Sequence, residues 1–151
     1  MNTPQEGEPM NDSPETADGI AASGEALRSR SPVIYAYTRR QALEDGGQVD
    51  VSETAREAGI RFPVYLTRAV WNAYVEVPPG VHCQDEAGRL WDVLWMFAVA
   101  ARRTDGADLL FRLYVRNDNR RPRLVTLKAT CGPRDIDDPA PAITIMQPEE
   151  D

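Results

Sequence analysis

Residues 90–100 read Leu90-Trp-Asp-Val-Leu-Trp-Met-Phe-Ala-Val-Ala100, a run that is apolar almost all round. A helix of this composition is typically buried on more than one side. Asp85 stands where an N-cap residue is expected, and Arg102 and Arg103 fall in the last turn, where positive charge complements the helix dipole. We therefore predict one long buried helix over residues 86–103.

The aromatic side chains of this region are expected in the core. Trp91 and Trp95 are four residues apart and share one face of the predicted helix. Together with Trp71 and Phe97 they are better explained as packing residues than as a platform for stacking a ligand.

Short elements are predicted on the N-terminal side. Val33–Tyr37 is β-branched and aromatic, which is typical of a strand. Thr38 and Gln41 have the spacing of a capping box, so a helix is expected over residues 39–45, ended by Gly46.

A second short helix is expected next, capped by Asp50 or Ser52 and ended by Gly59. For residues 63–75 two interpretations stay open. They form either one long helix with Pro63 at its first position, or a strand followed by a shorter helix that Thr67 caps. The helical spacing of the apolar residues slightly favours the single helix.

The C-terminal part has the pattern of strands. Leu109–Arg116 and Leu124–Cys131 alternate apolar and polar residues, and the connection over residues 117–123 is rich in turn formers. These strands are expected to pair as an antiparallel hairpin, with Ala142–Met146 as a further strand. The fold class predicted is α+β: a short N-terminal strand and helices, one long buried helix, and a C-terminal antiparallel sheet with a β-hairpin.

The chain is expected to contain one domain with acidic ends. Residues 1–31 hold six acidic residues against Arg28 and Arg30 and almost no large apolar groups, so we predict a disordered acidic leader. Residues 32–147 form the predicted α+β domain and residues 148–151 an acidic tail.

Charge and hydropathy restrict the surroundings in which the protein works. The net charge of −7 argues against attraction of the whole surface to nucleic acid or to an anionic membrane. No apolar run approaches the roughly 20 residues of a membrane-spanning helix, and the first residues lack the pattern of a secretory signal. We expect a cytoplasmic protein without membrane partners.

The most distinctive local feature is a cluster of arginines in the predicted hairpin turn: Arg116, Arg120, Arg121 and Arg123, opposed only by Asp118. Guanidinium groups on an exposed turn can bind phosphate or carboxylate groups bidentately. The alternative is a solvated turn whose charges discourage edge-to-edge pairing of strands.

Other chemistry-bearing residues are not expected to form a site. His82 and Cys83 are adjacent, but paired, closely spaced metal ligands are missing, so we predict a loop histidine and, with Cys131, two packed thiols. The acidic run with Asp135, Asp137 and Asp138 lacks the glycine and terminal Glu of a calcium loop and is expected to be a solvated loop. We predict no metal and no cofactor.

Several segments carry a resemblance to a known family. They are Tyr37–Gly46, Val49–Gly59, Val64–Trp71, Gly88–Met96, Val115–Asn119 and Leu127–Gly132. The chain resembles an uncharacterised bacterial family of small proteins, a domain of unknown function that is often encoded near plasmid, integrative-element or phage genes. The resemblance covers residues 33 to 147 and implies no activity and no functional residues.

A second resemblance concerns the opening strand and helix, Ile34–Gly46, followed by Val64–Thr67. This order looks like the start of small ADP-ribosyltransferase domains and implies a candidate cleft at Tyr35, Thr38 and Tyr65. Those domains place a histidine or arginine on the first strand and a glutamate on a late strand. This sequence has neither at the matching positions.

The leading hypothesis is a non-catalytic accessory or interaction protein of a mobile genetic element that binds a protein or nucleic-acid partner. The alternative is a diverged ADP-ribosyltransferase-like enzyme that uses NAD. The sequence does not give the identity of the partner or the oligomeric state.

Overall fold

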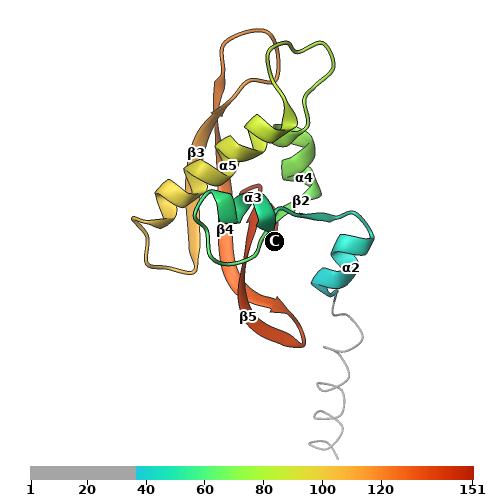
Figure 1. Cartoon of the computed structure of the whole chain (residues 1–151), viewed down its shortest axis with the longest axis vertical. Helices are drawn as coiled ribbons and strands as arrows, with labels where there is room; N and C mark the ends of the chain where they lie inside the picture. The colour runs from blue at the N-terminus through green and yellow to red at the C-terminus, as the bar shows by residue number, and fades with distance from the viewer. Residues whose placement is uncertain (1–36) are drawn as a thin grey trace, which may run out of the picture. The chain divides into compact units, whose positions relative to one another are not determined.

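The structure is a computed structural model, and it describes residues 37–151 (Figure 1). The predicted leader and the predicted strand at Val33–Tyr37 lie outside these residues, except for Tyr37, which belongs to no strand. Tyr35 of the candidate cleft also lies outside them.

A five-stranded sheet forms the centre of the described domain. In the order in which they pair, its strands are β1 (Gln48–Asp50), β2 (Val64–Thr67), β5 (Asp138–Met146), β4 (Arg123–Asp135) and β3 (Asp108–Val115). Only β2 and β5 run parallel, and the other neighbours are antiparallel. The predicted α+β class and the C-terminal antiparallel strands are therefore confirmed. The sheet as a whole is mixed, because β2 pairs with β5 in the parallel direction.

Four α-helices and one π-helical turn complete the regular structure of residues 37–151. They are α2 (Arg39–Glu44), α3 (Ser52–Glu57), α4 (Arg68–Val70), a π-helical turn η1 (Trp71–Val75) and α5 (Glu86–Ala101). The capping box at the start of α2 is confirmed, since the Thr38 hydroxyl accepts the Gln41 N–H and the Gln41 side chain accepts the Thr38 N–H. Gly46 follows the helix with a φ of 79°, a left-handed conformation that glycine takes without strain.

The strand-then-helix interpretation of residues 63–75 is correct, and the single long helix is wrong. The reason is tertiary: β2 lies between β1 and β5, and its Val64 and Leu66 side chains are fully buried. Ladder hydrogen bonds to two neighbours outweigh a helical spacing of apolar residues. Thr67 then caps α4 as predicted, because its hydroxyl accepts the Val70 N–H at 3.3 Å.

Helix α5 begins as predicted, with the Asp85 carboxylate accepting the Gly88 N–H at 2.7 Å. It lies across one face of the sheet (Figure 1). The side that packs on the sheet and on the neighbouring helices is buried: Leu90, Val93, Leu94, Phe97 and Ala98.

The prediction that Trp91 and Trp95 belong to the core is wrong. Their exposed fractions are 36% and 43%, and the two rings stack on each other with centroids 5.9 Å apart. An apolar helix covered on one side only must leave its other side to solvent, whatever its composition.

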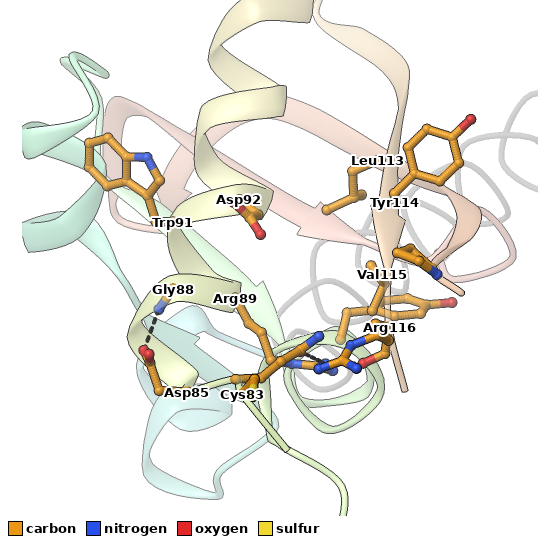
Figure 2. Close-up of a pocket in the computed structure, with 13 residues that line it drawn as sticks. Cys83, Asp85, Gly88, Arg89, Trp91, Asp92, Leu113, Tyr114, Val115 and Arg116 are labelled. Atoms are coloured by element: carbon orange, nitrogen blue, oxygen red, sulfur yellow. Dashed lines mark hydrogen bonds between the residues drawn. The ribbon is translucent and has the colours of Figure 1, made fainter. Parts of the chain in front are cut away.

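The predicted β3–β4 hairpin is confirmed, and its two faces differ in burial. Phe111 and Leu113 are buried toward α5, whereas Leu110 and Tyr114 on the opposite face are 64% and 68% exposed. Figure 2 shows the Leu113 side chain pointing toward α5 and Tyr114 pointing away from it. One face of this hairpin is therefore uncovered within the described part of the chain.

The acidic segment expected as a solvated loop is instead the end of the β4–β5 hairpin. Asp135 pairs with Asp138 across the turn. The Asp135 carboxylate also accepts the backbone N–H groups of Arg39 at 3.1 Å and Arg40 at 3.0 Å, at the start of α2. A residue distant in sequence thus satisfies free donors at a helix N-terminus.

This contact predicts a pH dependence of stability. Backbone N–H donors, that of Ile136 first and those of Arg40 and Arg39 after it, hold the pKa of Asp135 below its ordinary value of 3.8. The ionised carboxylate therefore contributes stability above that value, and the contribution is lost as the pH falls through the lower pKa of the folded state. In urea titrations between about pH 5 and pH 2, Asp135→Asn should lose less stability than the wild type.

The neighbouring Asp137 supplies the control, since its ion pair with Arg40 is 3.8 Å long and exposed. Asp137→Asn should keep the pH dependence of the wild type. Equal slopes for all three proteins would contradict the proposed role of Asp135.

Candidate functional site

The structure divides the four predicted arginines into two groups. Arg120 and Arg121 are exposed on the connection between β3 and β4, and Arg123, the first residue of β4, is exposed as well. Arg116 is partly buried, and its guanidinium donates to the carbonyl oxygen of His82. Three of the four side chains are therefore exposed to a partner, and the fourth ties the connection to the loop before α5. We call Arg120, Arg121 and Arg123 the arginine turn.

Side-chain contacts fix the backbone of this connection. The Asn117 amide donates to the carbonyl oxygen of Ala73 at 2.9 Å, and the Asn119 amide donates to that of Gly80 at 2.8 Å. Asn119 also accepts the His82 N–H at 3.0 Å. The arginines thus project from a connection held at two points, which lowers the entropy cost of binding.

The one carboxylate of the connection only partly offsets its charge. Asp118 lies 3.7 Å from Arg123, and both side chains are substantially exposed. Its other oxygen accepts the Arg120 N–H at 2.9 Å, which shapes the turn. An exposed pair of this kind is weak and exchanges readily for another anion.

Beneath the arginine turn lies a residue that sequence reasoning missed. Arg89, in the first turns of α5, is only 5% exposed. Its Nε donates to Val75 O at 3.1 Å, Nη1 donates to Gln84 Oε1 and Arg116 O at 2.7 Å each, and Nη2 donates to Asn117 Oδ1 at 2.6 Å. Figure 2 shows the side chain extending from the helix toward Arg116. A single guanidinium therefore joins η1, the loop before α5 and the end of β3.

All four acceptors of Arg89 are neutral, and within residues 37–151 it forms no ion pair. Burial lowers the pKa of Arg89, and the charge of nearby Asp92 opposes that shift. Partial burial in turn raises the pKa of Asp92. A cavity of about 450 Å³ opens here, lined among others by Tyr74, Arg89, Asp92 and Arg116.

The residues of the candidate enzyme cleft are engaged in structural contacts. The Thr38 hydroxyl caps α2. Tyr65 is 2% exposed and lies under Arg39, whose guanidinium carbon is 4.2 Å from the ring centroid. A hollow of about 520 Å³ lies beside Thr38, but Tyr65 does not line it. No observation on the described residues favours the NAD-using enzyme.

The prediction of two packed thiols is wrong for Cys83. Cys83 is exposed in the loop before α5, whereas Cys131 on β4 is partly buried and pairs with Ile143. Within residues 37–151 no three His, Cys, Asp or Glu side chains gather closely enough to hold a metal ion. None of the helices over the same residues is long and apolar enough to cross a membrane.

The fold and the site define an α+β domain with a mixed sheet and an arginine-bearing connection at one end, in which residues 37–151 leave one face of the β3–β4 hairpin uncovered. The chain belongs to DUF6573, a family of unknown function, which it matches over residues 27–151. No curated protein and no solved structure matches the sequence.

Proposed function

We propose that this protein is a non-catalytic accessory protein of a mobile genetic element that docks on an anionic partner, a nucleic acid or an acidic protein, through the arginine turn. The observation that carries the proposal is the exposure of three guanidinium groups on a connection held by Asn117 and Asn119. Arginine pairs bidentately with phosphate and carboxylate groups. The association with a mobile element rests on the family resemblance of the sequence.

The charge of the rest of the molecule supports a local mode of binding. The whole chain carries a net charge of −7, so the arginine turn is a basic spot on an acidic protein. Such a distribution orients an anionic partner toward one end of the domain and repels it elsewhere.

The test removes the three charges together in the variant Arg120→Ala/Arg121→Ala/Arg123→Ala. Its binding is measured by fluorescence anisotropy with a labelled single strand and a labelled duplex of about 20 nucleotides, and with polyglutamate. We expect the dissociation constant for the bound probe to rise at least about tenfold, and the slope of log K against log salt to become shallower by about 2 to 3.

A matched control removes the same charge elsewhere. Arg56, Arg61 and Arg103 are exposed on other parts of the domain, and changing all three to alanine leaves the arginine turn intact. This control should bind like the wild type. If both triple variants weaken binding equally, net charge and not the arginine turn is responsible, and the proposed surface is rejected.

A further inference from the structure

The uncovered face of the β3–β4 hairpin alternates aromatic, aliphatic and basic side chains. On β3 it carries Leu110, Arg112 and Tyr114, of which Tyr114 is 68% exposed. On β4 the residues paired with them are Lys128, Thr126 and Leu124. We call these six residues the open face. Two exposed leucines and a tyrosine on one sheet face are unusual for a surface that contacts only water.

The open face leads into the connection that carries Arg120 and Arg121, whereas Arg123 pairs with the buried Val115 and so belongs to the other face of the hairpin. Tyr114 pairs with Leu124 in the last part of the hairpin, and the connection with Arg120 and Arg121 follows directly. Arg112 lies two residues before Tyr114 on β3 and on the same face, about 7 Å away by the geometry of a strand. A ligand that follows β3 therefore meets positive charge on both sides of the tyrosine.

The end of the open face that is distant from Arg120 and Arg121 is less basic. The Lys128 ammonium donates to the backbone carbonyl of Glu150 at 2.8 Å, close to the acidic C-terminal residues. Asp108 begins β3 at the end away from the arginine turn. The charge of this surface thus favours a track along Arg112, Tyr114 and the connection with Arg120 and Arg121 over one across the whole sheet.

Resting on the proposed function, we infer that the anionic partner is a single-stranded nucleic acid that follows this track, with a base stacked on Tyr114 and its phosphates near Arg112, Arg120 and Arg121. Unpaired bases stack on exposed tyrosine rings, and guanidinium groups bind the adjoining backbone. A duplex keeps its bases stacked on one another, so it engages the arginine turn but gains nothing from Tyr114.

The test compares Tyr114→Ala with Tyr114→Phe on the same labelled single strand and duplex. Tyr114→Ala should weaken binding of the single strand about tenfold or more, because one base loses its stacking partner. Tyr114→Phe keeps the ring and should bind within about twofold of the wild type, and neither change should affect the duplex. Tyr37→Ala is the control, since Tyr37 is also exposed and lies next to α2.

The outcomes separate this inference from the proposed function. If Tyr114→Ala binds the single strand like the wild type while the triple arginine variant does not, the inference fails and the arginine turn stands. Binding of polyglutamate alone overturns the inference in favour of an acidic protein. If the wild type binds none of the three probes, both proposals fail. Because Tyr114 is exposed, circular dichroism should show an unchanged fold for both variants.

Discussion

Replacing Arg89 by alanine should lower the free energy of unfolding by about 3 kcal/mol or more and the melting temperature by roughly 10 °C. The change removes four hydrogen bonds and leaves the carbonyl oxygens of Val75 and Arg116 and the amide of Asn117 without their donor. Buried acceptors that lose a charged donor cost more than an average hydrogen bond. Thermal and urea unfolding of purified protein measure the effect.

Two further variants test whether the hydrogen bonds of the Arg89 guanidinium cause this loss. Arg89→Lys keeps the charge but has one nitrogen in place of three, so it should recover less than half of the loss. Arg103→Ala removes an exposed arginine just beyond the same helix and should change stability by less than about 0.5 kcal/mol. A loss below about 1 kcal/mol for Arg89→Ala would mean that solvent replaces the guanidinium, contrary to its burial.

The position of Arg89 also connects the core to the proposed binding surface. Its partners Arg116 O and Asn117 Oδ1 belong to the start of the connection that carries the arginine turn. Any variant that loosens this contact frees the connection and raises the entropy cost of docking. For that reason the binding tests above change exposed residues and leave Arg89 in place.

Local signals in the sequence predicted the local structure. Thr38 and Gln41 identified the start of α2, Asp85 identified the start of α5, and alternation identified β3. Each of these signals depends on residues within a few positions of one another.

The failures depend on contacts between distant segments. Val64–Thr67 is a strand because it pairs with β5, which lies far along the chain. Trp95 is exposed because the described residues cover only one side of α5. The periodicity of the sequence does not show how many sides of a helix are covered. Arg89 was overlooked for the same reason: its acceptors come from three segments, and an arginine within an apolar helix gives no sign of where they lie.

A second arginine, Arg39, holds α2 against the face of the sheet that carries Tyr65 and Thr144. Its Nε donates to Arg134 O at 2.6 Å, Nη1 to Gln48 Oε1 at 2.7 Å and Nη2 to Thr144 Oγ1 at 3.0 Å, while the guanidinium lies over the ring of Tyr65. Burial lowers the pKa of Arg39, as expected where solvent is partly excluded.

Arg39→Ala should therefore lower the free energy of unfolding by about 2 kcal/mol, from the lost hydrogen bonds and the lost cation–π contact with Tyr65. The neighbouring Arg40 is the control, because within residues 37–151 its side chain makes only an exposed ion pair with Asp137 at 3.8 Å. Arg40→Ala should cost less than about 0.5 kcal/mol. Arg39→Lys should resemble Arg39→Ala more than the wild type, since an ammonium cannot reach three acceptors and stack at once.

Hydrogen exchange separates a local from a global role for Arg39. If the guanidinium only fastens α2, Arg39→Ala should speed amide exchange in residues 39–44 and leave β2 and β5 protected. Faster exchange of Tyr65 and Thr144 as well would show that the guanidinium also covers the sheet, since both residues are buried beside it. We expect the second pattern, because the guanidinium carbon lies 4.2 Å from the centroid of the Tyr65 ring and so covers one face of it.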